Sequence, residues 1–148
     1  MPEKQTLDRA REDKQEGKSA STQAGEFVRE EMHHIREGKH GAASPKQAIA
    51  IGLSKARRAG VELLPPRAGS ASSETRKKAA RDTSKGRRSH GEVSSKRSRA
   101  TTQALKKKGH SAASRPALSK QARSAANRRG PTARHESAMK ASRTRKVA

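Results

Sequence analysis

The stretch Ser44-Pro-Lys-Gln-Ala-Ile-Ala-Ile-Gly-Leu-Ser-Lys-Ala-Arg-Arg-Ala-Gly60 combines apolar residues with a helix start signal and a helix stop signal. Ser44 is a suitable N-cap, Pro45 suits the first helical position, and Gln47 follows at the spacing of a capping box. Gly60 is typical of the position just after a helix. The apolar positions recur every three or four residues and form one stripe: Ile49, Gly52, Leu53, Ala56 and Ala59. The sequence therefore predicts a helix between Ser44 and Gly60.

The segment just upstream shows the same helical spacing of apolar residues. Thr22 is the predicted N-cap, and this helix is expected to run to about Glu37, with Gly38 ending it. Its apolar positions are Ala24, Phe27, Val28, Met32 and Ile35. The short connection to the next helix favours antiparallel neighbours. Because the first helix is rich in Glu and the second carries Lys and Arg without any acid, the two are expected to attract each other.

The rest of the chain offers little that can form a core. Hydrophobic residues make up 28% of the 148 residues, and Phe27 is the single aromatic. The sequence therefore predicts a mostly disordered protein with a small all-α part, an antiparallel helical hairpin over about 22–60 within a domain of residues 21–66. Residues 1–20 are expected to be a polar lead-in with a frayed helix. Residues 67–148 are expected to be a basic, low-complexity tail with transient helices.

Positive charge is concentrated after Pro66. Residues 1–66 hold 12 Lys and Arg against 10 Asp and Glu, whereas residues 67–148 hold 24 against 4. So large an excess favours a polyanion as partner. The basic region lacks the aromatic side chains on which single-strand binders stack bases. Duplex DNA or structured RNA is therefore the better target, and DNA is favoured over RNA.

Basic clusters of the tail are the candidate contacts to nucleic-acid phosphates. They contain Arg76, Lys77, Lys78, Lys85, Arg87, Arg88, Lys96, Arg97, Arg99, Lys106, Lys107, Lys108, Arg128, Arg129, Arg143, Arg145 and Lys146. Further candidates in the hairpin are Lys39, His40, Arg57 and Arg58. The turn from Gly38 to Gly41 has the GxxG form with which K-homology domains hold a nucleic-acid backbone. Because no strand pattern accompanies this turn, Gly38 is expected to be a helix C-cap instead.

The sequence predicts a non-enzymatic, nucleoid-associated type of protein that binds DNA without sequence preference through its cationic tail. Two alternatives stay open. One makes the hairpin a protein-interaction module with a localising basic tail, and the other makes the chain an RNA- or ribosome-associated protein. The wide apolar face around Ile49 and Leu53 is also a candidate homodimer interface.

Several classes of site are not expected. The chain has no cysteine, which excludes disulfides and thiolate chemistry. Of its six histidines, His33 and His34 are adjacent and face different directions on a helix, and no metal-ligand set appears at a familiar spacing. The segment Gly52-Leu-Ser-Lys-Ala56 departs from the G-x-S-x-G nucleophile motif at its last position. We therefore expect no enzymatic activity, metal, cofactor or small-molecule substrate.

Neither a signal peptide nor a membrane span is recognisable in the sequence. A cytoplasmic, nucleoid-associated location without a membrane partner is the corresponding expectation.

Across the turn and the second helix the chain reads Glu37-Gly-Lys-His-Gly-Ala-Ala-Ser-Pro-Lys-Gln-Ala-Ile-Ala-Ile-Gly-Leu-Ser-Lys-Ala-Arg-Arg-Ala-Gly60. This block resembles small, basic bacterial proteins of uncharacterised function that share the pattern EGKHGxxSxKQAIAIGLSxARRAG. Such proteins often continue into a tail rich in Lys, Arg, Ala and Ser, and the tail here is similar to histone-like C-terminal tails. The resemblance implies a bacterial origin and carries no activity with it.

Overall fold

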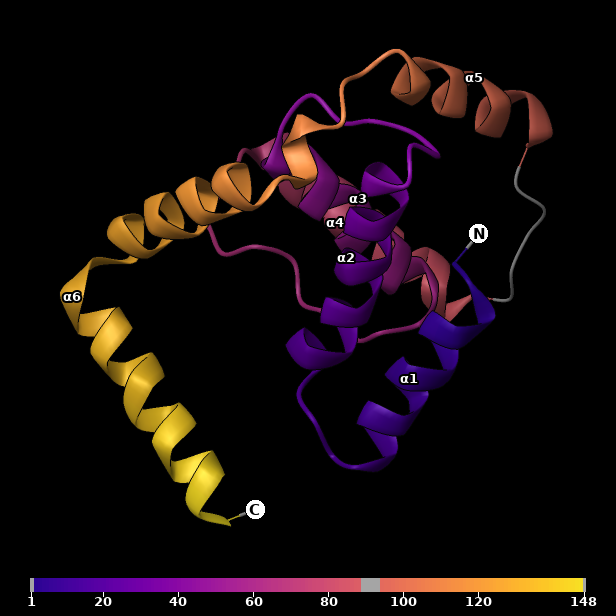
Figure 1. The fold of residues 1–148 in the computed structure, drawn as a ribbon. Coiled ribbons are helices and arrows are strands. Elements are labelled where there is room, and N and C mark those ends of the chain that lie inside the picture. The colour runs from indigo at the N-terminus through magenta and orange to yellow at the C-terminus, as the bar shows by residue number, and fades with distance from the viewer. Residues whose placement is uncertain (1, 89–93, 148) are drawn as a thin grey trace. The chain divides into compact units, whose positions relative to one another are not determined.

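A computed structural model describes residues 2–88 and 94–147 (Figure 1). The described residues form six α-helices and one 3₁₀ turn: α1 (Lys4–Gln15), α2 (Ala20–Arg36), α3 (Pro45–Arg58), α4 (Ser73–Arg87), α5 (Ser95–Lys106), η1 (Ser111–Ala113) and α6 (Arg115–Val147). Internal contacts divide the chain into two compact units, Met1–Ala113 and Ser114–Ala148, which we call the first unit and the second unit.

The prediction of a mostly disordered chain is wrong, because 75% of the chain is helical and the region after Pro66 forms α4, α5 and α6. That prediction rested on the small number of large apolar side chains. The first unit instead packs many small side chains, and Ala79, Ala112 and Ala113 are all buried outside the hairpin. Small residues let helix backbones approach closely, so dense packing does not require large side chains. The chain divides after Ala113 and not at Pro66, since α4 packs against α3.

The hairpin of α2 and α3 forms the centre of the first unit. Gly52 on α3 lies against the backbone of Val28 on α2. One turn further along α3, Ala56 packs with Ala24 and Phe27, which precede Val28 on α2. Contacts that move forward on one helix and backward on the other show that the two helices run antiparallel.

Serine side chains cap the starts of both hairpin helices. Ser44 Oγ accepts the backbone N–H of Gln47 at 3.2 Å, as the sequence predicts. Ser19 caps α2 by accepting the backbone N–H of Thr22 at 3.3 Å. The choice of Thr22 as N-cap is therefore wrong by three residues, because Thr22 supplies the amide that the actual cap binds. Gly38 follows α2 with a φ of 74°, as expected for a residue that ends a helix.

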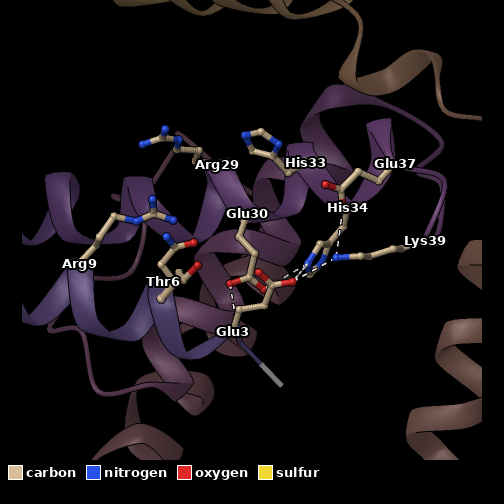
Figure 2. A pocket seen from close by; sticks show the side chains of 10 residues that line it. Glu3, Thr6, Arg9, Arg29, Glu30, His33, His34, Glu37 and Lys39 are labelled. Atoms are coloured by element: carbon tan, nitrogen blue, oxygen red, sulfur yellow. Dashed lines mark hydrogen bonds and ion pairs between the residues drawn. The ribbon is translucent and has the colours of Figure 1, made fainter.

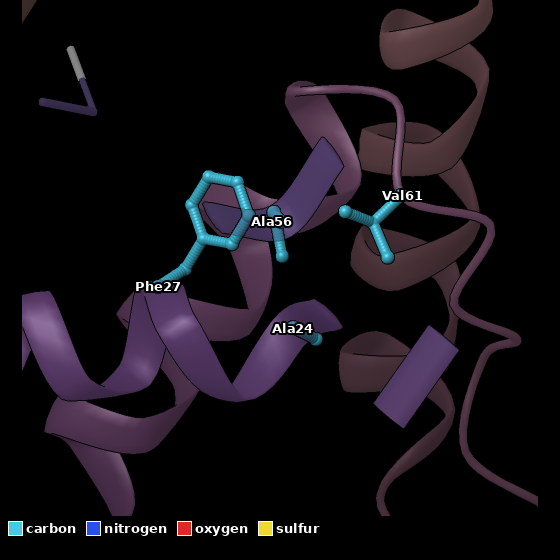
Figure 3. Close-up of a cluster of buried hydrophobic side chains, with 5 residues drawn as sticks. Ala24, Phe27, Ala56 and Val61 are labelled. Atoms are coloured by element: carbon cyan, nitrogen blue, oxygen red, sulfur yellow. The ribbon is translucent and has the colours of Figure 1, made fainter. Parts of the chain in front are cut away.

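A small apolar core lies where α1, α2 and α3 meet. It consists of Ala10, Ala24, Phe27, Ala56 and Val61 (Figure 3). Helix α1 contributes Ala10 to this cluster and also buries Thr6, which is 1% exposed. Arg9 on the same helix forms an ion pair with Glu26 of α2 at 2.9 Å. Residues 4–15 are therefore packed against the hairpin, in contrast to the frayed lead-in expected from the sequence.

Helix α4 is joined to α3 through a buried carboxylate. Asp82 is 8% exposed and accepts hydrogen bonds from Ser54 Oγ at 2.7 Å and from Arg58 Nε at 2.8 Å. These two donors satisfy a carboxylate that would otherwise be costly to bury. Residues that the sequence assigned to a disordered tail thus complete the first unit.

The apolar face proposed as a dimer interface is partly used inside the chain. Leu53 is half-buried and packs against the core, and Ile49 is half-buried as well. Coverage of the remaining surface by a second copy stays a prediction.

Helices α5 and α6 expose most of their surface. Within the described part of the chain, α5 packs against no other helix. Helix α6 bends at Gly130, whose φ of 77° and ψ of 170° interrupt the helix just before Pro131. Proline lacks an amide hydrogen and clashes with the preceding turn, so a bend at this position is expected.

Candidate functional site

We call α4, α5 and α6, with the residues directly after α4 and α5, the cationic helices. Their basic side chains project into solvent wherever the structure describes them. The exposed candidates are Arg76, Lys77, Lys78, Lys85, Arg87, Arg88, Lys96, Arg97, Arg99, Lys106, Lys107, Lys108, Arg128, Arg129, Arg143 and Arg145. The side chain of Lys146 lies outside the part that the structure describes. Lys78 forms an ion pair with Glu74 at 2.7 Å, which lowers the pKa of that carboxyl. The other exposed candidates are open to a partner to the extent that solvent reaches them.

The hairpin candidates have internal contacts. Arg57 is 7% exposed, and its Nε and Nη2 each donate to a backbone carbonyl, of Leu63 and Leu64 respectively, at 3.3 Å. Burial lowers the pKa of Arg57. Arg58 is bound to Asp82 of α4. Both arginines therefore fix the end of α3 to its surroundings.

The GxxG turn is occupied by the chain itself. The backbone N–H of Gly41 donates to the carbonyl of Leu105, and that of Ala42 donates to the carbonyl of Gly109, both at 3.1 Å. A phosphate clamp would need such amides free. The turn instead anchors the segment that follows α5.

Lys39 and His40, on the same turn, lie next to different acidic side chains. Lys39 Nζ lies 3.1 Å from Glu3 and 3.1 Å from Glu37, which raise the pKa of Lys39. His40 Nε2 lies 3.2 Å from Glu31 Oε1. Neither side chain is presented to solvent as an unpaired charge.

A polar pocket of about 290 Å³ opens between α1 and α2 (Figure 2). Glu3 Oε1 is hydrogen-bonded by His34 Nε2 at 2.8 Å and by Lys39 Nζ at 3.1 Å. The bond to His34, followed by that to Lys39, lowers the pKa of Glu3 to about 2. The backbone N–H of Glu3 donates to Glu30 Oε2 at 3.2 Å. Acidic, histidine and cationic side chains all line this pocket. It therefore lacks the excess of positive charge that the cationic helices carry.

A buried carboxylate, Glu31, directly follows Glu30 on α2. Glu31 is 0% exposed, and its Oε2 forms an ion pair with Lys55 of α3 at 2.7 Å. Lys55 also lies 3.4 Å from Glu30 Oε1. The expected attraction between the acidic and the basic helix is confirmed by these two ion pairs. No sequence signal indicates that Glu31 is completely buried.

Sequence reasoning also missed that Glu31, His34 and His40 converge, with one ligand atom of each lying within 4.8 Å of the others. Glu31 and His34 are three residues apart, which places them one turn apart on the same helical face. His40 is brought back by the turn at Gly38. The helical spacing of Glu31 and His34 is visible in the sequence. The position of His40 next to them depends on the tertiary structure. His90 lies outside the described residues.

Comparison with known proteins adds one match. Residues 15–68 match a family of unknown function (DUF6496). This range contains α2, the turn and α3, and it leaves the cationic helices outside. No curated protein and no solved structure shows a significant match. Among the helices of the described residues, none is both long enough and apolar enough to cross a bilayer.

Proposed function

We propose that the protein binds duplex DNA without sequence preference through the cationic helices. The observation that carries this proposal is the exposure of their basic residues, in a region that holds 24 Lys and Arg against 4 acids. Contacts from lysine and arginine to backbone phosphates release condensed counterions, which supplies affinity for any sequence.

Helix α6 supports the proposal most directly. Its residues 115–147 include one acid, Glu136, and within the described part of the chain it packs against no other helix. A helix without a packed apolar face needs either many internal ion pairs or a partner. Because a single acid cannot balance its many cations, a polyanion is the partner that would stabilise α6.

The composition favours a duplex over a single strand. Phe27 is the single aromatic of the chain, and it is 1% exposed within the core. No Phe, Tyr or Trp ring is therefore available to stack on an unpaired base, and such stacking helps to hold single strands. Contacts limited to backbone phosphates leave duplex DNA as the best target and structured RNA as the competitor.

Neutralising one cationic segment in the full chain tests the proposal. The triple substitution Lys106→Gln, Lys107→Gln and Lys108→Gln removes three exposed charges and changes no side chain of the hairpin. We expect it to weaken binding to a labelled DNA duplex at low salt by at least about tenfold, measured by fluorescence anisotropy. The matched control is Lys4→Gln, Lys14→Gln and Lys46→Gln, which removes three exposed charges from residues 1–66.

Equal losses in the two triple variants would contradict the proposal, because affinity would then follow net charge and not the cationic helices. The same titration with a structured RNA separates the two polyanions. Tighter binding to that RNA than to duplex DNA would contradict the choice of DNA.

A further inference from the structure

Three side chains of the first unit form a cluster that the proposed function does not use. Glu31 and His34 lie on the last turns of α2, and His40 lies in the turn before α3. We call these three residues the carboxylate–imidazole cluster. Glu31 is 0% exposed, and the side chains of His34 and His40 are 12% and 13% exposed. One ligand atom from each residue lies within 4.8 Å of the other two.

The hydrogen bonding of His40 leaves a cation-binding atom facing a carboxylate. Its Nδ1 lies 3.2 Å from the carbonyl oxygen of Gly41, which only accepts hydrogen bonds, so Nδ1 carries a proton. In a neutral ring the other nitrogen, Nε2, then holds a lone pair. Nε2 lies 3.2 Å from Glu31 Oε1, which is also an acceptor. Two acceptors at this distance need either a second ring proton or a metal ion between them.

The same arrangement is typical of metal-binding histidines. A ligating histidine commonly donates its remote N–H to a backbone carbonyl, which fixes the ring and leaves the other nitrogen for the metal. One ring nitrogen of His34 lies within 4.8 Å of a ligand atom of Glu31 and of His40. Its Nε2 lies 2.8 Å from Glu3 Oε1 and 3.9 Å from Glu30 Oε1. The two imidazole rings meet edge to face with centroids 6.1 Å apart.

We propose that Glu31, His34 and His40 bind a Zn²⁺ ion. Two imidazole nitrogens and one carboxylate oxygen are a ligand set that Zn²⁺ accepts, whereas Mg²⁺ and Ca²⁺ prefer oxygen ligands alone. The three ligand atoms now lie within 4.8 Å of one another. Zinc bonds of about 2.0–2.2 Å require these atoms to move somewhat closer together. His40 lies in a turn outside the helices and can supply that movement. A water molecule would take the fourth position, as in zinc sites with three protein ligands.

The surroundings suit a cation that enters from solvent. Lys55 binds Glu31 through Oε2, so it offsets the charge of the carboxylate and leaves Oε1 directed at His40. His34 also lines the polar pocket between α1 and α2, as do Glu3 and Glu30 (Figure 2). The pocket therefore connects the His34 side of the cluster to solvent.

Metal titration of the chelator-treated full chain tests this proposal. We expect saturation at one Co²⁺ per chain, with visible absorption from the bound ion that Zn²⁺ displaces and Mg²⁺ does not. His34→Gln and His40→Gln should each weaken binding by at least about tenfold. His33→Gln is the matched control, because His33 is an exposed neighbour on the same helix and lies outside the cluster.

Two results would overturn the proposal. One is an affinity that is the same in His40→Gln as in the unaltered chain, with circular dichroism showing that both are folded. The other comes from NMR spectra of the unaltered chain. There, the proposal predicts that Zn²⁺ shifts the ring resonances of His34 and His40 and leaves those of His135 in place. Equal shifts for all three histidines would indicate adventitious binding alone.

Discussion

Replacing Lys55 by methionine is expected to lower the free energy of unfolding by about 3 kcal/mol or more. Lys55 Nζ is 2.7 Å from Glu31 Oε2 and 3.4 Å from Glu30 Oε1, and the side chains of these two acids are 0% and 2% exposed. Methionine keeps the length of the side chain but removes the charge. Two buried carboxylates would then lose the cation that compensates their desolvation, which is the costly way to break a buried ion pair. Denaturant unfolding in the presence of a chelator measures the loss.

Lys46→Met is the control for this substitution. It removes a lysine from the first turn of the same helix, where the side chain is exposed. We expect a change within about 0.5 kcal/mol, as for most surface substitutions. If Lys55→Met is as mild as this control, solvent reaches Glu31 and the buried ion pair does not contribute as described.

Replacing Gly52 by alanine is expected to destabilise the first unit by about 2 kcal/mol. A Cβ at this position would lie 2.7 Å from Val28 Cα and 3.0 Å from Val28 Cγ2. The nearer atom is backbone, so it cannot rotate away, and α2 and α3 would have to separate. Separation would open the core around Phe27 and lengthen the ion pairs of Lys55. Thermal unfolding followed by circular dichroism measures the effect.

Gly25→Ala is the matched control, and its effect should have the opposite sign. Gly25 lies inside α2, and a Cβ there meets nothing within 4 Å. Alanine favours the helix over glycine by about 0.5–1 kcal/mol, so this variant should be more stable than the unaltered chain. Destabilisation of similar size in both variants would contradict the close packing of α2 against α3.

Local signals explain why the hairpin was predictable. Ser44, Pro45 and Gly60 each act within one helical turn, and the apolar spacing of α3 follows from the helix repeat alone. The start of α2 was missed because Ser19 and Thr22 are both good N-cap residues. The choice between them depends on where the first backbone amide without a partner inside the helix lies. The long-range contacts of Thr6 and Asp82 have no local signature, so the packing of α1 and α4 was missed.

The solvent exposure of the basic candidate residues was predictable where charge alone keeps a side chain at the surface. The side chains of Lys106 to Lys108 are exposed, although half-buried Leu105 directly precedes them. Charge alone could not predict that Arg57 and Arg58, adjacent at the end of α3, differ in exposure and in partners. Arg57 turned out to be buried and Arg58 bound to Asp82, because the backbone after α3 and the later helix α4 supply their partners.

Salt dependence of DNA binding by the full chain tests the central claim most directly. Dissociation constants are measured for two duplexes of unrelated sequence over a range of salt concentrations. Non-specific phosphate binding predicts equal constants for both duplexes and a log–log slope steeper than about 5, since each neutralised phosphate contributes about 0.9. A shallow slope, or a strong preference for one duplex, would contradict binding through the cationic helices.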